Sequence, residues 1–240
     1  MPSSSARREL PDALRGFSLC SMILYHGMWD LVFLAGVSAP WYLGLPGFLW
    51  QQSICWCFIL LSGYCHALGR RHWQRGLLLI GCGALIRLVT AVVLPAAPIR
   101  FGVLTLLGLS TLLLTALRPL FDRISPPAGL IGSFLLFALS YRVPQGSFAG
   151  IALPLSLYRN QATALFGFPP ASFVSSDYFS LLPWFFLFLT GAFFFALRRG
   201  AEPVRMRPVP LLSWMGRHSL VIYLLHQPVL YGLGMLLRLF

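Results

Sequence analysis

The segment DALRGFSLCSMILYHGMWDL, residues 12–31, carries ionisable side chains within a stretch that is otherwise apolar. These side chains are Arg15, His26 and Asp30. An ionisable group in the hydrocarbon core of a bilayer costs about 3 kcal/mol or more, and such groups usually face a functional interior. The segment therefore predicts catalysis or transport. A polar pair that only locks helix packing would give the same pattern.

The spacing of the three residues supports a shared task. His26 follows Arg15 by eleven residues, which is about three turns at ~3.6 residues per turn, so both lie on one helix face. Asp30 follows His26 by four residues, the spacing at which helical side chains touch. A carboxylate beside an imidazole fixes its tautomer and raises its basicity. We therefore expect Asp30 to orient His26 as a general base.

A second polar group lies in the last apolar stretch. Ser219, Tyr223 and His226 recur at helical spacing and share one face. At ~1.5 Å per residue, His26 and His226 both lie about 20 Å from the inner end of their segments, so we expect them to face one cavity. Pro228 cannot donate to the carbonyl of Leu224 and either bends the helix or leaves that acceptor free. For His226 alone, a core histidine bonded to a neighbouring helix is an equal alternative.

Two further charged residues need partners. Arg87 lies near the middle of an apolar stretch and must meet an anion, which is either Asp30, a substrate phosphate or a transition-state oxyanion. Asp177, in SSDYFSLLPW, stands just before another apolar stretch. A helix cap is the simplest role for Asp177, and the position also places a carboxylate at the outer mouth of the protein.

The composition predicts an all-α, polytopic transmembrane bundle. The chain has 240 residues, 58% of them hydrophobic and 10% charged, and its mean hydropathy is +0.77. Soluble domains carry about 25% charged residues. The net charge of +12 comes from arginine, and because the arginines lie in short loops we ascribe most of them to membrane topology rather than to nucleic-acid binding. We expect one domain over 1–240.

About seven spans are expected, each approaching the ~20 apolar residues that a crossing needs. Their ranges are 12–36, 47–69, 76–95, 101–118, 126–141, 180–198 and 211–237. Residues 1–11 then form a cytoplasmic tail, and 142–179 form a long outer loop that holds either a short interfacial helix or a packing loop.

Arginine predicts the orientation, because loops on the inner side are richer in positive charge. With the N-terminus cytoplasmic, the inner segments hold Arg7, Arg8, Arg70, Arg71, Arg75, Arg118, Arg123, Arg198, Arg199, Arg205 and Arg207. The outer segments hold Arg100, Arg142, Arg159 and Arg238. The excess on the inner side supports this orientation.

The cysteines predict neither disulfides nor a metal centre. All five fall in apolar runs and are typical of reduced, buried small hydrophobes. Cys55 and Cys57 are two residues apart and face different directions on a helix, and no zinc-type spacing occurs. We expect no bound metal.

Four segments together resemble a known family. DALRGFSLCSMILYHGMWDL, RFGVLTLLGLS from Arg100, DYFSLLPW from Asp177 and MGRHSLVIYLLHQPV from Met215 look like the bacterial relatives of heparan-α-glucosaminide N-acetyltransferase, in order along nearly the whole chain. The first segment is also similar to the acyltransferase-3 group of membrane proteins, which share an arginine and a histidine separated by ten residues.

The resemblance implies a multi-pass enzyme of the bacterial cytoplasmic membrane that moves an acetyl or other acyl group. The donor would be cytosolic acetyl-CoA, with no bound cofactor, and the acceptor a sugar or envelope glycan on the outer face. By resemblance, His26 takes the place of a catalytic polar residue, His226 matches a histidine of the last span, and His218 stands where lysosomal relatives carry asparagine. Thr105 departs from the histidine common in close relatives.

The expected mechanism combines these residues. His26, oriented by Asp30, removes a proton from the acceptor, and Tyr223, Arg87 or neutral His226 stabilises the oxyanion. The donor's phosphates would bind at the cytoplasmic face, among Arg70, Arg71, Arg75, Arg198 and Arg199, which membrane topology alone also explains. Arg15 and Arg217 are kept as donor candidates because they adjoin the motifs, with His218. Direct transfer and an acetyl-histidine intermediate both stay open.

The main alternative is a transporter or flippase for an envelope precursor, whose intramembrane charges line the pathway. The sequence also leaves open the acceptor, the acyl chain length, and whether the protein works as a homodimer.

Overall fold

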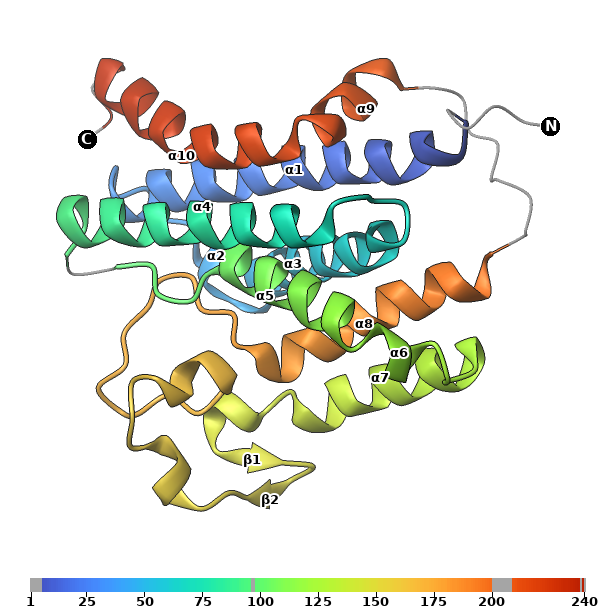
Figure 1. The fold of residues 1–240 in the computed structure, drawn as a ribbon. Coiled ribbons are helices and arrows are strands. Elements are labelled where there is room, and N and C mark those ends of the chain that lie inside the picture. The colour runs from blue at the N-terminus through green and yellow to red at the C-terminus, as the bar shows by residue number, and fades with distance from the viewer. Residues whose placement is uncertain (1–5, 96–97, 200–208, 238, 240) are drawn as a thin grey trace. The chain divides into compact units, whose positions relative to one another are not determined.

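The computed structural model describes residues 6–95, 98–199, 209–237 and 239. The expected tail residues 1–5 and the expected inner and outer arginines Arg205, Arg207 and Arg238 lie outside this part of the chain. Most of the described residues are helical, and the strands among them form one short hairpin (Figure 1). They group into two compact units, unit 1 with residues 1–58 and 200–240 and unit 2 with residues 59–199. Whether these units act as one domain stays a prediction.

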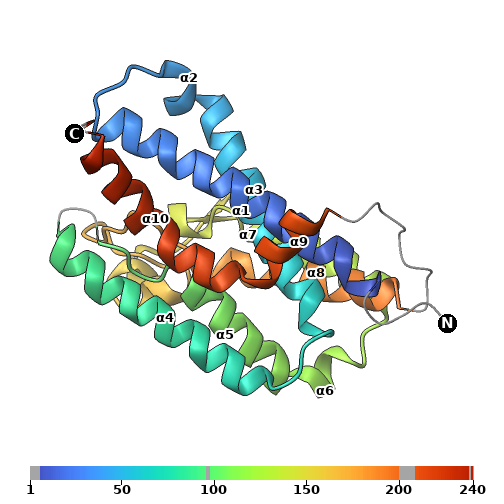
Figure 2. The same cartoon turned by 90° about the horizontal axis from the view of Figure 1, so that it is seen from above.

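Unit 1 is built on the longest helix, α1 (Ala6–Phe33). Figures 1 and 2 both show α9 (Pro210–Arg217) and α10 (Ser219–Leu236) lying along it. The short α2 (Pro40–Leu43) and the first part of α3 (Leu45–His66) complete the unit. Buried Leu19, Met22 and Ile54 form its core.

Glycine allows α9 to approach α1 closely. A Cβ atom on Gly16 would lie 2.0 Å from the carbonyl oxygen of Leu212, and one on Gly216 would lie 1.9 Å from that of Asp12. Small residues at such crossings let helix backbones touch in a bilayer. These two positions set the register of α9 against α1, and through it the register of α10.

Unit 2 holds the rest of α3 and the remaining helices. They are α4 (His72–Val93), α5 (Val103–Ala116), α6 (Arg118–Phe121), α7 (Pro126–Ser140) and α8 (Leu181–Leu197). Within unit 2, α4 packs on α5 and α7 packs on α8. Ser133 and Thr190 share a buried hydrogen bond of 3.0 Å across the second pair.

The long loop 142–179 contains no α-helix in its described residues, all of which belong to unit 2. It holds three 3₁₀ turns, η1 (Val143–Gln145), η2 (Leu155–Tyr158) and η3 (Thr163–Phe166), and a hairpin of β1 (Ser147–Phe148) and β2 (Ile151–Ala152). Of the two alternatives for this segment, the short 3₁₀ turns favour the packing loop over an interfacial α-helix, and glycines of positive φ lie at Gly146, Gly150 and Gly167.

The membrane prediction is confirmed in its coarse form. Four described helical segments are long and apolar enough to cross a bilayer, namely α3, α4, 126–145 and α10, while α5 and α8 are apolar but shorter. The polar residues of α1 keep it out of this group. The count of about seven spans and the cytoplasmic N-terminus stay predictions.

Two helix boundaries differ from the expected ranges. α1 spans Ala6–Phe33, so part of the expected cytoplasmic tail 1–11 is helical, while the place of that tail relative to the membrane stays a prediction. The expected last span 211–237 is divided at His218, where the backbone leaves the helical region between α9 and α10. The physical reason is that α9 is held against α1 at Gly216, whereas α10 is held at His226 and Gln227, and a bend lets the chain keep both contacts.

Candidate active site

The structure brings His26 of α1 and His226 of α10 together inside unit 1. Their ring centroids lie 4.9 Å apart, with the ring planes inclined by 57°. Both side chains are partly buried. The equal depth deduced from the sequence thus corresponds to direct contact between the two imidazoles, within reach of one reacting group.

The hydrogen bond of His226 defines which of its nitrogens carries the proton. Nδ1 lies 2.5 Å from the backbone oxygen of Tyr223. A carbonyl oxygen only accepts, so Nδ1 is the donor and Nε2 of the neutral ring holds a lone pair. Nε2 is buried and has no hydrogen-bond partner within the described chain. A buried nitrogen base with an open lone pair can take a proton from a substrate.

Asp30 is placed differently from the expected arrangement. Its side chain is 4% exposed, and Oδ1 accepts a 2.8 Å hydrogen bond from Nε2 of Gln227 on α10. The contact joins α1 to α10 one residue beyond His226. Asp30 Oδ2 and Gln227 Oε1 are both buried without a hydrogen-bond partner in the described residues, so two acceptors remain for the hydroxyl or amine hydrogens of a substrate.

Sequence reasoning missed Gln227. The signal was present, because Gln227 is the only amide side chain in 211–237 and lies at the depth of Asp30. A buried carboxylate requires a hydrogen-bond donor, and a neutral amide costs less to place in hydrocarbon than a charged donor does.

Aromatic side chains surround the two histidines within unit 1. The Tyr223 ring lies 5.5 Å from that of His226, and the Tyr25 ring lies 5.9 Å from that of His26. Tyr25 also contacts Trp50, whose indole N–H donates a 2.8 Å hydrogen bond to Ser21. These rings limit water around the imidazoles and fix the corner where α1 meets α3.

Arg15 lies on α1 near the crossing with α9. Its Nη1 is 3.7 Å from Asp12 Oδ1, and its side chain is only 12% exposed. Its Nη2 is buried and unbonded within the part of the chain described. A buried guanidinium with an unused N–H can hold one more anionic oxygen.

Arg217 and His218 lie at the junction of α9 and α10, and both are exposed. Nδ1 of His218 lies 2.9 Å from the backbone oxygen of Trp214. These two residues therefore lie at the surface of unit 1, just before the helix α10 that carries His226.

The two remaining candidates, Arg87 and Asp177, belong to unit 2. Arg87 lies in the middle of α4 with an exposed side chain, and its pairing with Asp30 or a substrate anion stays a prediction. Asp177 Oδ2 accepts a hydrogen bond from the backbone N–H of Val103 at 3.3 Å. It therefore caps α5, rather than the helix that follows it in sequence.

The surroundings of Asp177 join two of the sequence motifs. Ser175 Oγ accepts from the Arg100 backbone N–H at 2.9 Å, and the Phe179 N–H donates to the Phe101 oxygen at the same distance. Burial raises the pKa of the Asp177 carboxyl to about 6, although the Val103 hydrogen bond acts in the opposite direction.

No group of three metal-binding side chains is found among the described residues. The imidazole pair offers an unbonded ring nitrogen, and the Asp30–Gln227 pair offers two unbonded oxygens.

Comparison with known proteins identifies a family. Residues 7–228 match the family described as heparan-alpha-glucosaminide N-acetyltransferase, catalytic. No curated protein and no solved structure matches the chain. The match includes the first three motif segments and the fourth as far as Pro228. The apolar helices agree with a membrane acetyltransferase. The chain therefore belongs to the heparan-alpha-glucosaminide N-acetyltransferase catalytic family.

Proposed function

We propose that this protein transfers an acetyl group from cytosolic acetyl-CoA to a hydroxyl or amine of a sugar on the outer face of the membrane. The observation that carries the proposal is the buried, unbonded Nε2 of His226 beside the ring of His26. Family membership supports acetyl transfer, and the four membrane-length helices support a membrane setting.

The two imidazoles have different roles in the reaction, with His226 as the general base and His26 as a hydrogen-bond donor. Nε2 of His226 takes the proton from the acceptor as its oxygen or nitrogen attacks the thioester carbonyl. The C–S bond then breaks, and the departing thiolate of CoA takes the proton from the imidazolium. The products are the acetylated sugar and free CoA thiol. This assignment exchanges the roles first expected for His26 and His226, because the Tyr223 carbonyl fixes the tautomer of His226.

The oxyanion formed in this step needs a hydrogen-bond donor. His26 in its neutral form carries one N–H, and its ring lies against that of His226. Removing one donor of this kind typically costs a factor of about 10²–10³ in kcat. Tyr223 is the second candidate donor, because its ring contacts that of His226.

Asp30 and Gln227 serve as positioning residues in this proposal. Their hydrogen bond holds α10 against α1 and fixes the neighbouring His226. Their free oxygens accept hydrogens from the sugar. Arg15, through its unused N–H, together with Arg217 and His218 at the α9–α10 junction, binds anionic parts of the donor. Arg87, which lies in unit 2, binds an anionic group of a substrate. Asp177 acts by capping α5.

The test is acetyl transfer by the purified protein in proteoliposomes. Labelled acetyl-CoA is the donor, and glucosamine and N-acetylglucosamine are the acceptor probes, since only the first carries a free amine. His226→Gln is expected to lower turnover by about 10²–10⁴-fold, as the loss of a general base does. Leu225→Ala, an exposed neighbour on α10, is the matched control and should keep wild-type turnover.

Each outcome decides between function classes. Transfer to either probe that falls with His226→Gln supports the enzyme. Absence of transfer by the wild-type protein to both probes and to native envelope glycans would refute it and favour the transporter. Label trapped on the protein after a rapid, cold, denaturing quench at neutral pH identifies an acetyl-histidine route, and label found only on the sugar identifies direct transfer.

A further inference from the structure

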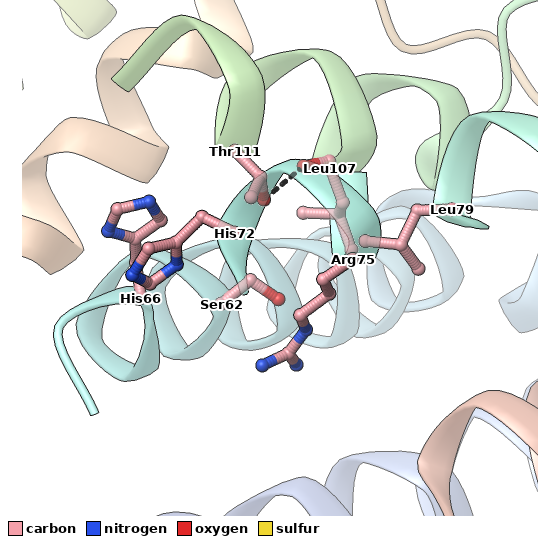
Figure 3. Close-up of a pocket in the computed structure, with 7 residues that line it drawn as sticks. All are labelled: Ser62, His66, His72, Arg75, Leu79, Leu107 and Thr111. Carbon is pink, nitrogen blue, oxygen red and sulfur yellow. Dashed lines mark hydrogen bonds between the residues drawn. The ribbon is translucent and has the colours of Figure 1, made fainter. Parts of the chain in front are cut away.

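A second cluster of titratable side chains lies in unit 2, where α3 ends and α4 begins. A pocket there is lined by residues of α3, α4 and α5, namely Ser62, His66, His72, Arg75, Leu79, Leu107 and Thr111. Figure 3 shows the two imidazole rings lying together and Arg75 extending from α4 near Ser62. None of these residues belongs to the His26–His226 site.

The two imidazoles of this pocket are stacked. The rings of His66 and His72 have centroids 4.1 Å apart and planes inclined by only 17°. The hydroxyl of Thr115 donates its proton to the Thr111 oxygen at 2.6 Å, so it accepts from Nε2 of His66 at 3.1 Å. Nε2 therefore carries the proton of the neutral His66 ring and Nδ1 holds a lone pair, so this ring does not donate into the pocket.

The charge around the pocket is strongly positive. Arg75 and Arg118 both act electrostatically on the two imidazoles. Arg70 and Arg71 lie in the adjoining turn. Within the described part of this region, the acidic residue is Asp122, which pairs with Arg118 at 3.3 Å. The Arg75 guanidinium, the His72 ring and the Ser62 hydroxyl line one small opening and can donate hydrogen bonds to a tetrahedral oxyanion.

We propose that this pocket binds a phosphate ester. Its enclosed part is small, so it accepts a single phosphoryl group at its mouth rather than a whole nucleotide. Arg75 provides paired N–H donors, Ser62 and His72 provide further hydrogen bonds, and the buried Leu107 and Thr111 form the inner wall. The described residues that line the pocket include no carboxylate, so no like charge there repels a phosphate group.

Two sources supply this chemistry at a membrane surface. One is a phosphate of the CoA donor, and this version rests on the proposed function. The other is the headgroup of an anionic phospholipid. Arg75 is the residue whose removal separates a specific pocket from a general positive surface, because Arg70 carries the same charge in the same turn but does not line the pocket.

The experiment measures binding by the whole protein in phosphatidylcholine nanodiscs. Calorimetry with CoA, with dephospho-CoA and with phosphate-free pantetheine gives three dissociation constants for the wild type, Arg75→Gln and Arg70→Gln. Loss of a charge-assisted, bidentate contact predicts about 10- to 100-fold weaker CoA binding by Arg75→Gln, with pantetheine unaffected. Arg70→Gln should change CoA binding by less than about threefold, as for an exposed charge. A parallel arm measures retention of phosphatidic acid by native mass spectrometry.

The outcomes separate the two sources. Weakened CoA binding specific to Arg75→Gln assigns the pocket to the donor. Phosphatidic acid retained by the wild type and lost from Arg75→Gln, with no CoA binding, assigns the pocket to a lipid headgroup and removes acetyl-CoA from the proposed function. The proposal is overturned if no phosphate-bearing probe distinguishes Arg75→Gln from Arg70→Gln. That last result leaves acetyl transfer at His226 intact.

Discussion

The hydrogen bond between Asp30 and Gln227 is the residue-scale contact that holds the two histidine-bearing helices in register. We expect Asp30→Ala and Gln227→Ala each to destabilise the protein, because each leaves a buried polar group unpartnered. A double-mutant cycle on unfolding in mixed micelles should give a coupling free energy of about 1–3 kcal/mol.

The control for this cycle pairs Asp30→Ala with Ser53→Ala, an exposed residue bonded to its own helix. That pair should be additive within about 0.5 kcal/mol. A similarly small coupling between Asp30 and Gln227 would show that their contact does not hold α10 against α1.

Asp177 makes the stability of unit 2 depend on pH. Its folded-state pKa of about 6 lies above the ordinary value of 3.8, so the folded protein binds this proton more tightly than the unfolded chain. The stabilisation is complete below pH 3.8 and is lost as the pH rises through 6. The wild-type Tm minus the Tm of Asp177→Asn should therefore rise as the pH falls from about 7.5 to 4.5.

Asp122→Asn is the matched control for this pH series, because Asp122 is exposed and pairs only with Arg118 in the ion pair at 3.3 Å. Its Tm difference from the wild type should change little over the same range. A Tm difference for Asp177→Asn that is flat with pH would contradict the buried cap.

At the scale of single residues, counting from the ends of two apolar runs predicted that His26 and His226 face one cavity. It could not predict the tautomer of His226, which depends on the Tyr223 carbonyl three residues earlier, or the choice of Gln227 as the partner of Asp30. Both depend on side-chain rotamers and on the rotation of α10 against α1, which periodicity does not specify.

At the scale of secondary-structure elements, glycines allow the close crossing of α9 with α1. Gly16→Ala would place a methyl group 2.0 Å from the Leu212 oxygen, so α9 must move away from α1. Overpacking of this kind costs about 1–3 kcal/mol, and we expect a lower Tm together with reduced acetyl transfer because the displacement reaches α10. Gly232→Ala on α10, where a Cβ meets nothing within 4 Å, should be neutral in both measurements. Equal effects of the two variants would contradict the close crossing.

Most helices were predictable at this scale, because long apolar runs between proline- and glycine-containing loops specify them almost completely. The break at His218 was missed, although Gly216, Arg217 and His218 interrupt the apolar pattern of 211–237 at that point. The contacts of Gly216 and His226 are compatible with the bend. The 3₁₀ turns of 142–179 were also missed, because short turns have no periodic signature.

At the scale of the whole molecule, the four sequence motifs form two pairs. The first and last motifs meet in unit 1 through α1, α9 and α10, and the second and third meet in unit 2 around Asp177. Motifs separated by most of the chain therefore have a common structural purpose within each unit. The sequence predicted the first pairing from depth, whereas the second required the observed hydrogen bonds between 98–103 and 175–179.

The membrane topology of the whole chain can be tested through its two termini. The arginine excess predicts a cytoplasmic N-terminus and an outer C-terminus, and hence an odd number of spans. Reporter fusions active only on one side of the membrane, placed at each terminus, should report opposite sides. Both termini on the same side would contradict seven spans.

The central claim is that His26 and His226 act as one catalytic unit, and single-turnover acetyl transfer tests it most directly. The rates of His26→Gln, His226→Gln and the double variant are compared with the wild type in proteoliposomes, and residues that act together lose their effects non-additively. We predict that the double variant is about as slow as the slower single variant. Two losses that multiply in the double variant, or a single variant with the wild-type rate, would contradict the account.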